Sequence, residues 1–360
     1  MFEVKEKASK LVRQKGWKDA SLNEARMKEL ATDVELSFED VLLMTKHLMP
    51  GQHVPLMNVY ATSVKKLQHV RDAFEYATSY VQIDILDELI ITHKEDDLLA
   101  EWILVYQLVL DFFRKKIGVE QMFERARTLF AYVKNPLVRI RLEFIEFNTL
   151  YQLQTISSSK LLERRSRTLF AQLQPSFMKT VLGSRLSLLL GCIKLYHEVD
   201  LESAERHFLA VIVNETTPDL FLCSAHHSLG TLMAINENPL CLQHGERAIK
   251  YAKRAKAYDY QRMLETEYVP FMRNCMKEIF EVSGVREEEQ VHQYIVRGEQ
   301  SRAKALINHL EAKGDASPFL VYYRGLTLNS IPLLFDSMEA FRESNAHMTK
   351  LVRRKIEQLL

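Results

Sequence analysis

The sequence predicts an all-α fold in which most of the chain is a stack of helix pairs. Only eleven Gly and nine Pro occur in 360 residues, and such a low content of helix-breaking residues favours long helices joined by short turns. Apolar residues recur at three- and four-residue spacing along almost the whole chain, which is the period of a buried helix face. A skeleton of glycine, a small residue and an aromatic residue also appears twice, as Gly191, Ala204 and Phe208 and again as Gly325, Ser337 and Phe341.

This skeleton is typical of a tetratricopeptide-like helix pair. Within residues 185–213, Gly191 falls in mid-helix, where a neighbouring helix can approach closely. Ala204 and Phe208 lie four residues apart in the following helix, so both face the partner helix. One such pair cannot bury its apolar face alone, and the pattern therefore predicts further pairs that stack into a superhelix.

Composition excludes several classes of protein. The chain is 47% hydrophobic and 26% charged, with a net charge of +1, so it has no global attraction to nucleic acid or membrane. The N-terminus lacks the apolar core of a signal peptide, and no apolar run approaches 18 residues. Four cysteines without a C-x-x-C spacing favour reduced, buried thiols and a cytoplasmic location: Cys192, Cys223, Cys241 and Cys275.

Residues 1–50 form a small basic front end. Six Lys or Arg and two Glu fall in the first eighteen residues, which gives a local charge of +4. A first short helix is expected before Gly16, and a capping box from Ser21 to Glu24 is expected to open a second. Its inward stripe is Met27, Leu30, Ala31 and Val34. A looser capping box from Ser37 to Asp40 opens a third helix that ends at Met49 and Pro50.

This order of helices is the layout of a helix-turn-helix DNA reader. Asn23 and Arg26 occupy the start of the expected recognition helix, where they would contact bases. Phosphate contacts are expected from Lys10, Lys15 and Lys18, and Lys28 is also available to DNA. The alternative is an ordinary helix pair with a solvated basic face, since Glu24 and Glu29 on the second helix would repel phosphate.

The superhelix is expected over residues 51–345, followed by a capping or dimerisation helix at 346–360. Its first half, to about residue 180, reads as helical hairpins without a clean repeat, and Asn135 and Pro136 start one of these helices. In the second half Pro270 kinks or splits a helical stretch over 258–282. The other expected helices span 220–235, 239–257, 287–296, 300–312, 320–328 and 331–344.

Catalytic and metal-binding motifs are absent, so the sequence predicts neither an enzyme nor a cofactor. There is no G-x-x-x-x-G-K-[ST], no G-x-G-x-x-G and no H-E-x-x-H. His226 and His227 are adjacent and therefore point about 100° apart on a helix, which places them poorly to clamp one metal ion.

Four segments resemble the arbitrium receptors (AimR) of temperate phages, relatives of the RNPP and Rap peptide-pheromone receptors. They are RDAFEYA at 71–77, FMRNCMKE at 271–278, SRAKALINHLE at 301–311 and the longer stretch at 322–345. The resemblance implies a helix-turn-helix followed by a tetratricopeptide-like superhelix, and a homodimer made partly by C-terminal helices. It also implies that a short secreted peptide binds the concave groove and switches off DNA binding that controls the lysis-lysogeny decision.

The resemblance further indicates groove positions. Those that match the family's peptide-holding Asn and Arg residues are Cys192, Tyr196, Leu220 and Thr231 here, none of which is Asn or Arg, whereas Asn274 fits. The peptide-binding set expected on this basis is Tyr196, Thr231, Arg273, Asn274, Arg297 and Tyr323. The alternative function is an AimR-like or Rap-like adaptor that has lost its peptide response and acts on a protein partner without binding DNA.

Overall fold

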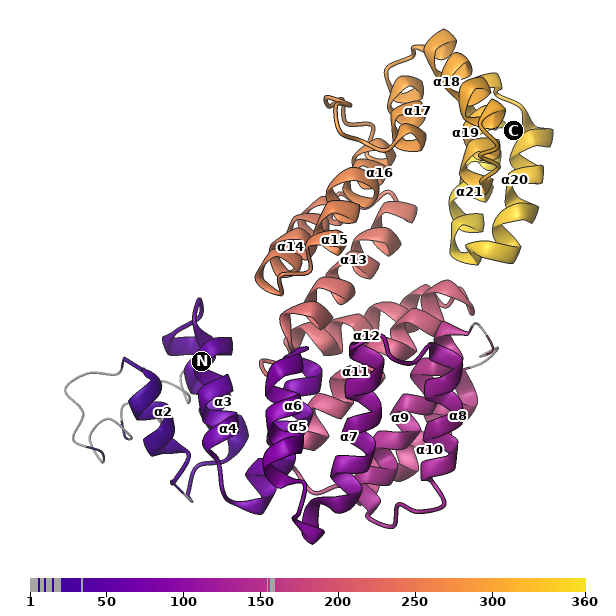
Figure 1. Cartoon of the computed structure of the whole chain (residues 1–360). Coiled ribbons are helices and arrows are strands. Elements are labelled where there is room, and N and C mark those ends of the chain that lie inside the picture. Colours follow the sequence, from indigo (N-terminus) through magenta and orange to yellow (C-terminus); the bar gives the residue numbers. More distant parts are fainter. Residues whose placement is uncertain are drawn as a thin grey trace. The chain divides into compact units, whose positions relative to one another are not determined.

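The fold is all-helical in the computed structural model, which describes residues 6, 10, 15, 21–33, 35–153, 155 and 159–360, and no strand occurs among them. Contacts divide the chain into two compact units (Figure 1). The first comprises residues 1–186 and 214–218, and the second comprises 187–213 and 219–360. The expected all-α class is confirmed.

The first unit is a series of helices, most of which pack on the next helix along the chain. They are α2 (Glu24–Leu30), α3 (Phe38–Leu48), α4 (His53–Ser63), α5 (Leu67–Ser79), α6 (Ile83–His93), η1 (Asp97–Leu99), α7 (Ala100–Phe113), α8 (Val119–Leu129), α9 (Pro136–Gln152) and α10 (Ser159–Gln172). The long helix α11 (Phe177–Tyr196) contributes residues to both units.

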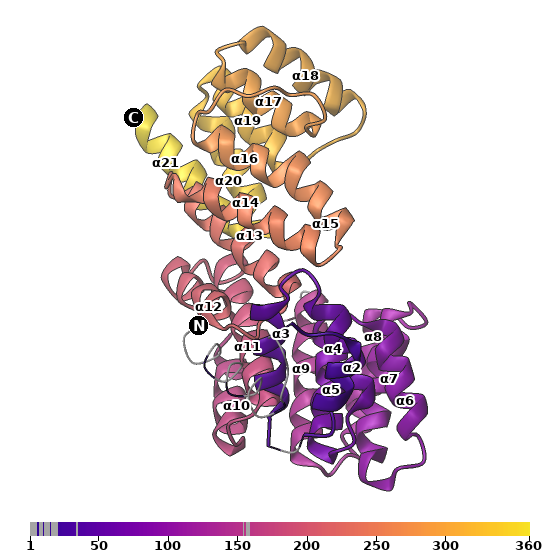
Figure 2. The same cartoon turned by 90° about the vertical axis from the view of Figure 1, so that its left-hand side faces the viewer.

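The second unit continues the same pattern of helix pairs, which the turned view in Figure 2 separates most clearly. Its elements are α12 (Leu201–Val213), α13 (Asp219–Ile235), α14 (Leu240–Arg254), α15 (Tyr258–Met263), the π-helical turn η2 (Leu264–Tyr268), α16 (Val269–Cys275), α17 (Glu287–Val296), α18 (Gln300–Ala312), α19 (Pro318–Leu328), α20 (Ile331–Ser344), η3 (Ala346–Met348) and α21 (Thr349–Leu359). The helices expected over 287–296, 300–312 and 331–344 are confirmed to the residue.

Glycines allow the close helix contacts that the sequence predicted in the second unit. A Cβ atom on Gly191 would lie 2.6 Å from the ring of Phe208, so α11 and α12 approach too closely for any side chain there. In the pair α19–α20, a Cβ on Gly325 would meet Leu334 at 2.9 Å. The glycine positions of both skeletons are therefore explained by packing.

Two local expectations are corrected. Helix α2 begins at Glu24 with Asn23 as its N-cap, whose side chain accepts from the amide of Arg26, so Ser21 does not form the expected capping box. The capping box between Ser37 and Asp40 is confirmed in both directions.

The second correction concerns the helical stretch expected over 258–282, which ends at Cys275. Pro270 has no amide hydrogen to give to the carbonyl of Thr266, four residues earlier. That carbonyl accepts instead from the amide of Arg286 at 2.9 Å, and the π turn η2 immediately precedes the helix that contains Pro270. Proline therefore splits the stretch, as expected, but the chain then leaves the helix earlier than its pattern indicated.

The core of the first unit contains a buried charge network around Glu75 of α5, whose side chain is fully buried. Its carboxylate lies 2.9 Å from Arg141 of α9 and 2.9 Å from Arg185 of α11, and it accepts from the hydroxyl of Tyr106 of α7. Burial would raise the pKa of Glu75, but the two guanidinium groups more than offset this and hold that pKa below its usual value. Four helices are joined at one ionised group.

Candidate functional site

Some of the front-end residues expected to contact DNA form hydrogen bonds or ion pairs within the front end, and others do not. Arg26 donates to the carbonyl and hydroxyl oxygens of Ser21, and Asn23 caps α2. Lys15 forms ion pairs with Asp33 at 3.0 Å and with Glu29 at 3.8 Å. Burial by itself would raise the pKa of Asp33, but its contacts with Lys15 hold that pKa below the usual value.

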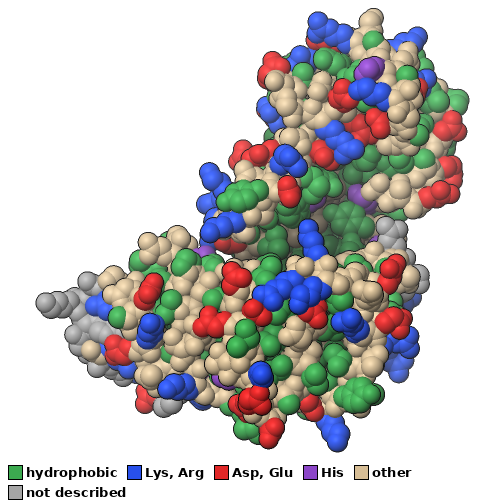
Figure 3. Space-filling view, in the orientation of Figure 1, with side chains coloured by type: hydrophobic (Ala, Val, Ile, Leu, Met, Phe, Trp, Pro, Cys, Tyr) green, Lys and Arg blue, Asp and Glu red, His purple; other side chains and the backbone are tan. Residues whose placement is uncertain are grey.

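Lys10 and Lys28 are exposed, and neither has a hydrogen bond or ion pair among the described residues. Lys18 lies outside the described residues. Helix α2 is held in place by Met27 and Leu30, which are fully buried in the core of the first unit, as its apolar stripe predicted. Basic side chains alternate with acidic ones on the face shown in Figure 3, which agrees with the near-zero net charge.

Two of the expected peptide-binding residues, Tyr196 and Thr231, belong to a group in the second unit that we call the α13 polar cluster: Tyr196 of α11, His227, Ser228 and Thr231 of α13, and His347 of η3. The hydroxyls of Tyr196 and Ser228 lie 3.2 Å apart, and the rings of Tyr196 and His347 meet edge to face at 4.8 Å. His227 and Thr231 share one face of α13 because they are four residues apart.

The α13 polar cluster contains three buried polar atoms without a hydrogen-bond partner among the described residues: Nε2 of His227, Oγ1 of Thr231 and Nδ1 of His347. An unsatisfied buried polar group costs about 1–3 kcal/mol, so native proteins place water or a ligand at such positions. Burial lowers the pKa of both His227 and His347 to about 4. Their imidazoles are therefore neutral near pH 7, with one donor and one acceptor nitrogen each. Nδ1 of His227 lies 2.8 Å from the hydroxyl of Tyr260, so Nε2 is the nitrogen that this ring leaves open.

Neutral donors and acceptors side by side suit an uncharged polar group such as a peptide amide better than a phosphate. No group of three potential metal ligands occurs among the described side chains. His226, next to His227, points away from the cluster, where its Nδ1 lies 2.8 Å from Nδ1 of His244, as the helical geometry predicted.

Three of the other four expected peptide-binding residues, Asn274, Arg297 and Tyr323, contact Glu289 or Gln293 of α17. Asn274 donates to Glu289 at 2.9 Å and accepts from Gln293 at 2.7 Å, while the hydroxyl of Tyr323 donates to Glu289 at 2.7 Å. Arg297 donates through Nε to Gln293 at 3.1 Å. This arrangement joins α16, α17 and α19.

The four residues Arg273, Asn274, Arg297 and Tyr323 differ in exposure, and this decides which of them a ligand can contact. Asn274 and Tyr323 are 1% and 0% exposed, so their polar groups are occupied inside the chain. Arg273 and Arg297 keep 33% and 21% of their side chains exposed. Arg273 pairs with Glu278 at 2.6 Å and stacks on Phe280. A ligand would therefore reach the two arginines first.

Sequence reasoning missed His227, Ser228 and His347. The spacing of His227 and Thr231 was a usable signal, because residues four apart share a helix face. The contact between Tyr196 and His347 has no local signal, since 151 positions separate them along the chain.

The model of the family described as AimR transcriptional regulator-like matches residues 53–358. The solved structure of SeMet-phAimR is similar with a TM-score of 0.73 and 20% identity, over 97% of this chain and 96% of that one. The structure of phAimR-Ligand has a TM-score of 0.65 and 21% identity, over 90% of this chain and 98% of that one. At these identities the two structures show the fold alone.

No curated protein matches the chain. None of the described helices is long and apolar enough to cross a membrane.

Proposed function

The chain belongs to the AimR transcriptional regulator-like family, and from this premise we propose that it is a DNA-binding regulator that a short communication peptide controls in a phage lysis-lysogeny decision. The observation that carries the proposal is the α13 polar cluster, with its three buried polar atoms that have no partner among the described residues. The name of one similar structure, phAimR-Ligand, records a ligand for that protein.

The backbone amides of the peptide would bind to the side chains of His227, Thr231 and His347. The partly exposed Tyr196, Arg273 and Arg297 would hold the peptide's side chains or terminus. The cluster joins helices that are far apart in sequence, α11, α13 and η3. A ligand bound there changes the conformation of the protein only to the extent that it binds one arrangement of these helices better than another.

Peptide control is tested with synthetic peptides that match the C-terminal end of a small open reading frame downstream of the gene. The expected result is saturable binding that Tyr196→Phe weakens, since this change removes only the hydroxyl. Tyr258→Phe is the matched control, because that tyrosine is 67% exposed outside the cluster. Equal weakening by both changes, or no binding by any encoded peptide, would remove the cluster as the peptide site.

DNA binding is proposed for the front end through Lys10, Lys18 and Lys28. Replacing Lys10 and Lys28 by Ala should reduce the slope of log affinity against log salt by about one unit for each lost phosphate contact. Lys94→Ala is the control, since this exposed lysine follows α6 outside the front end. An unchanged slope in the double variant would contradict the DNA assignment.

A second candidate function is an adaptor that acts on a protein partner without binding DNA. Two observations favour it: Lys15, Asn23 and Arg26 are engaged within the front end, and the family match begins only at residue 53. Absence of any DNA binding near physiological salt, together with a stable complex with another regulator, would select this candidate.

We also propose a homodimer. Leu351, Val352 and Ile356 of α21 are buried within the chain, where α21 packs on α20, so this helix caps the second unit. A second copy would then meet the outward face of α21, which carries the exposed Lys350 and Arg353. Sedimentation of Arg353→Glu against wild type tests this arrangement, and an unchanged dimer would place the interface elsewhere.

A further inference from the structure

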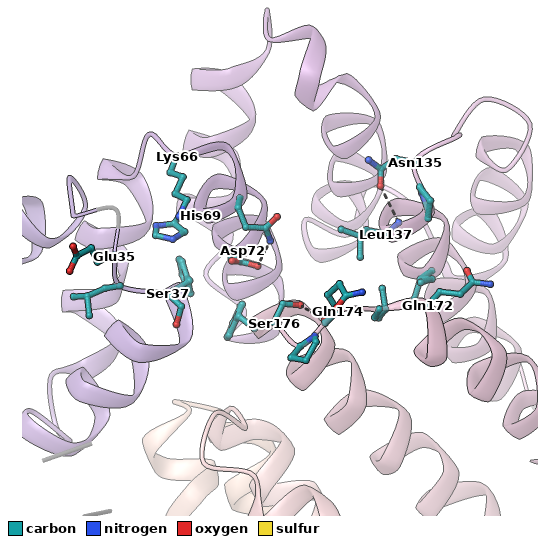
Figure 4. A pocket seen from close by; sticks show the side chains of 18 residues that line it. Glu35, Ser37, Lys66, His69, Asp72, Asn135, Leu137, Gln172, Gln174 and Ser176 are labelled. Carbon is teal, nitrogen blue, oxygen red and sulfur yellow. Dashed lines mark hydrogen bonds between the residues drawn. The ribbon is translucent and has the colours of Figure 1, made fainter. Parts of the chain in front are cut away.

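A cavity of about 630 Å³ lies in the first unit, apart from the α13 polar cluster. Its volume falls within the roughly 300–1,000 Å³ that is usual for small-molecule sites. Side chains from the start of α3, the start of α5, the start of α9 and the turn between α10 and α11 line it. In Figure 4, Lys66 and His69 lie on one side and Asn135 and Leu137 on the other, with Asp72 between them.

The walls are largely apolar, and Phe38, Leu137, Ile140 and Phe177 contribute to them. The rings of Phe38 and Phe177 pack with their centroids 4.9 Å apart. A mainly apolar pocket with a few convergent polar groups is the usual composition of a ligand site. The polar group best placed to orient a ligand is the carboxyl of Asp72, which is 4% exposed.

Asp72 contrasts with Glu75, which lies one turn further along the same helix. Glu75 is paired with two arginines, whereas Asp72 forms no ion pair among the described residues. Its hydrogen bond comes from the amide of Gln68, at 3.2 Å. Burial raises the pKa of Asp72 to about 7, and the charges of Glu39 and Glu75 add to this effect. Arg71 and the hydrogen bond from Gln68 act in the opposite direction. The chain thus pairs one buried carboxylate of α5 with two cations and leaves the other without an ion pair among the described residues.

We propose that this cavity is a second ligand site, which takes a small molecule with an apolar body and one protonated amine, and that Asp72 binds the amine. The apolar body would lie between Phe177 and Leu137 in place of water. The amine would supply the charge partner that the chain does not, since ion pairing offsets the cost of a buried carboxylate. Because Ser37 and Phe38 also line the cavity, the ligand would contact the front end and the repeat helices together.

The site predicts a dependence on pH. The ionised carboxylate binds the amine, so affinity should rise about tenfold between about pH 6 and pH 8 as Asp72 loses its proton. The charged and titratable groups around Asp72 are Glu39 of α3, Tyr60 of α4, Arg71 and Glu75 of α5, and Lys66, His69 and Glu35 at the cavity wall. Burial and the nearby Lys66 both lower the pKa of His69.

The test uses the full chain with two probes of equal shape, phenethylammonium and the neutral 2-phenylethanol, titrated by calorimetry or ligand-observed NMR. The expected result is saturable binding in which the amine binds at least tenfold more tightly than the alcohol at about pH 8. Asp72→Asn should abolish that preference and leave the alcohol's affinity unchanged. Asp84→Asn is the control, because this aspartate is exposed in the first turn of α6.

Leu137→Trp, which fills the cavity from the half-buried start of α9, should prevent binding of both probes. Leu137→Trp also tests the site if Asp72→Asn fails to fold. The pH series is measured on the wild-type protein and needs no variant. Equal affinity for the amine and the alcohol, a pH-independent amine affinity, or no saturable binding of the amine would each overturn the proposal. These readouts involve neither peptide nor DNA, so they are independent of the function proposed above.

Discussion

Thr231→Val should stabilise the protein without its ligand and weaken its response to peptide. Thr231 is 3% exposed, and its Oγ1 has no hydrogen-bond partner among the described residues. Valine has nearly the same shape and similar helix propensity, so the main change is loss of an unsatisfied hydroxyl. Removing a penalty of about 1–3 kcal/mol should raise the free energy of unfolding by about 1 kcal/mol after partial relaxation.

The matched control is Thr149→Val. Thr149 is also buried in mid-helix, but its hydroxyl donates to the carbonyl of Ile145 at 2.9 Å. This change removes a satisfied hydrogen bond, so it should lower stability by about 0.5–1.5 kcal/mol. The two variants therefore differ in sign although the chemical change is identical.

Equilibrium urea denaturation followed by circular dichroism measures both effects, with the transition of each unit analysed separately if the two unfold apart. Peptide titration of the same samples should show affinity reduced about five- to tenfold in Thr231→Val, which corresponds to the loss of about one hydrogen bond. If Thr231→Val destabilises the protein as much as Thr149→Val does, its hydroxyl has a partner in solution and the reasoning is refuted.

Three further outcomes are expected from urea denaturation. Gly191→Ala should lower the free energy of unfolding by about 1–2 kcal/mol, because its methyl group would lie 2.6 Å from the facing phenylalanine ring, whereas Gly51→Ala, with open space around it, should not. Glu75→Gln should cost about 3–5 kcal/mol, since two arginines lose their carboxylate partner; a loss below about 1 kcal/mol would show that the pairs contribute little. When the pH falls from about 7.5 to 5, His227 and His347 should each lower the free energy of unfolding by on the order of 2 kcal/mol. Their pKa of about 4 in the folded state lies below the unfolded value, so the unfolded state binds more protons. A free energy of unfolding that does not change with pH would contradict their burial as neutral rings.

The helices were readable from the sequence wherever their signals are local. Residue spacing located α17, α18 and α20, and the contact that Gly191 makes with Phe208 followed from the glycine and aromatic skeleton. Such signals act within about four residues, the reach of one helical turn. The capping of α2 by Asn23 instead of Ser21 shows their limit, since both residues can cap a helix and the choice depends on where the helix starts.

The polar groups that carry the candidate sites were decided by tertiary structure. The sequence by itself determined an all-α repeat fold and a basic front end, because helix period, glycine content and charge are properties of short segments. It could not show that Asn274 is hydrogen-bonded to Glu289, that His347 meets Tyr196, or that Asp72 lines a cavity. Those facts depend on which distant helix supplies a hydrogen-bond or charge partner, and only the packing of the folded chain decides that.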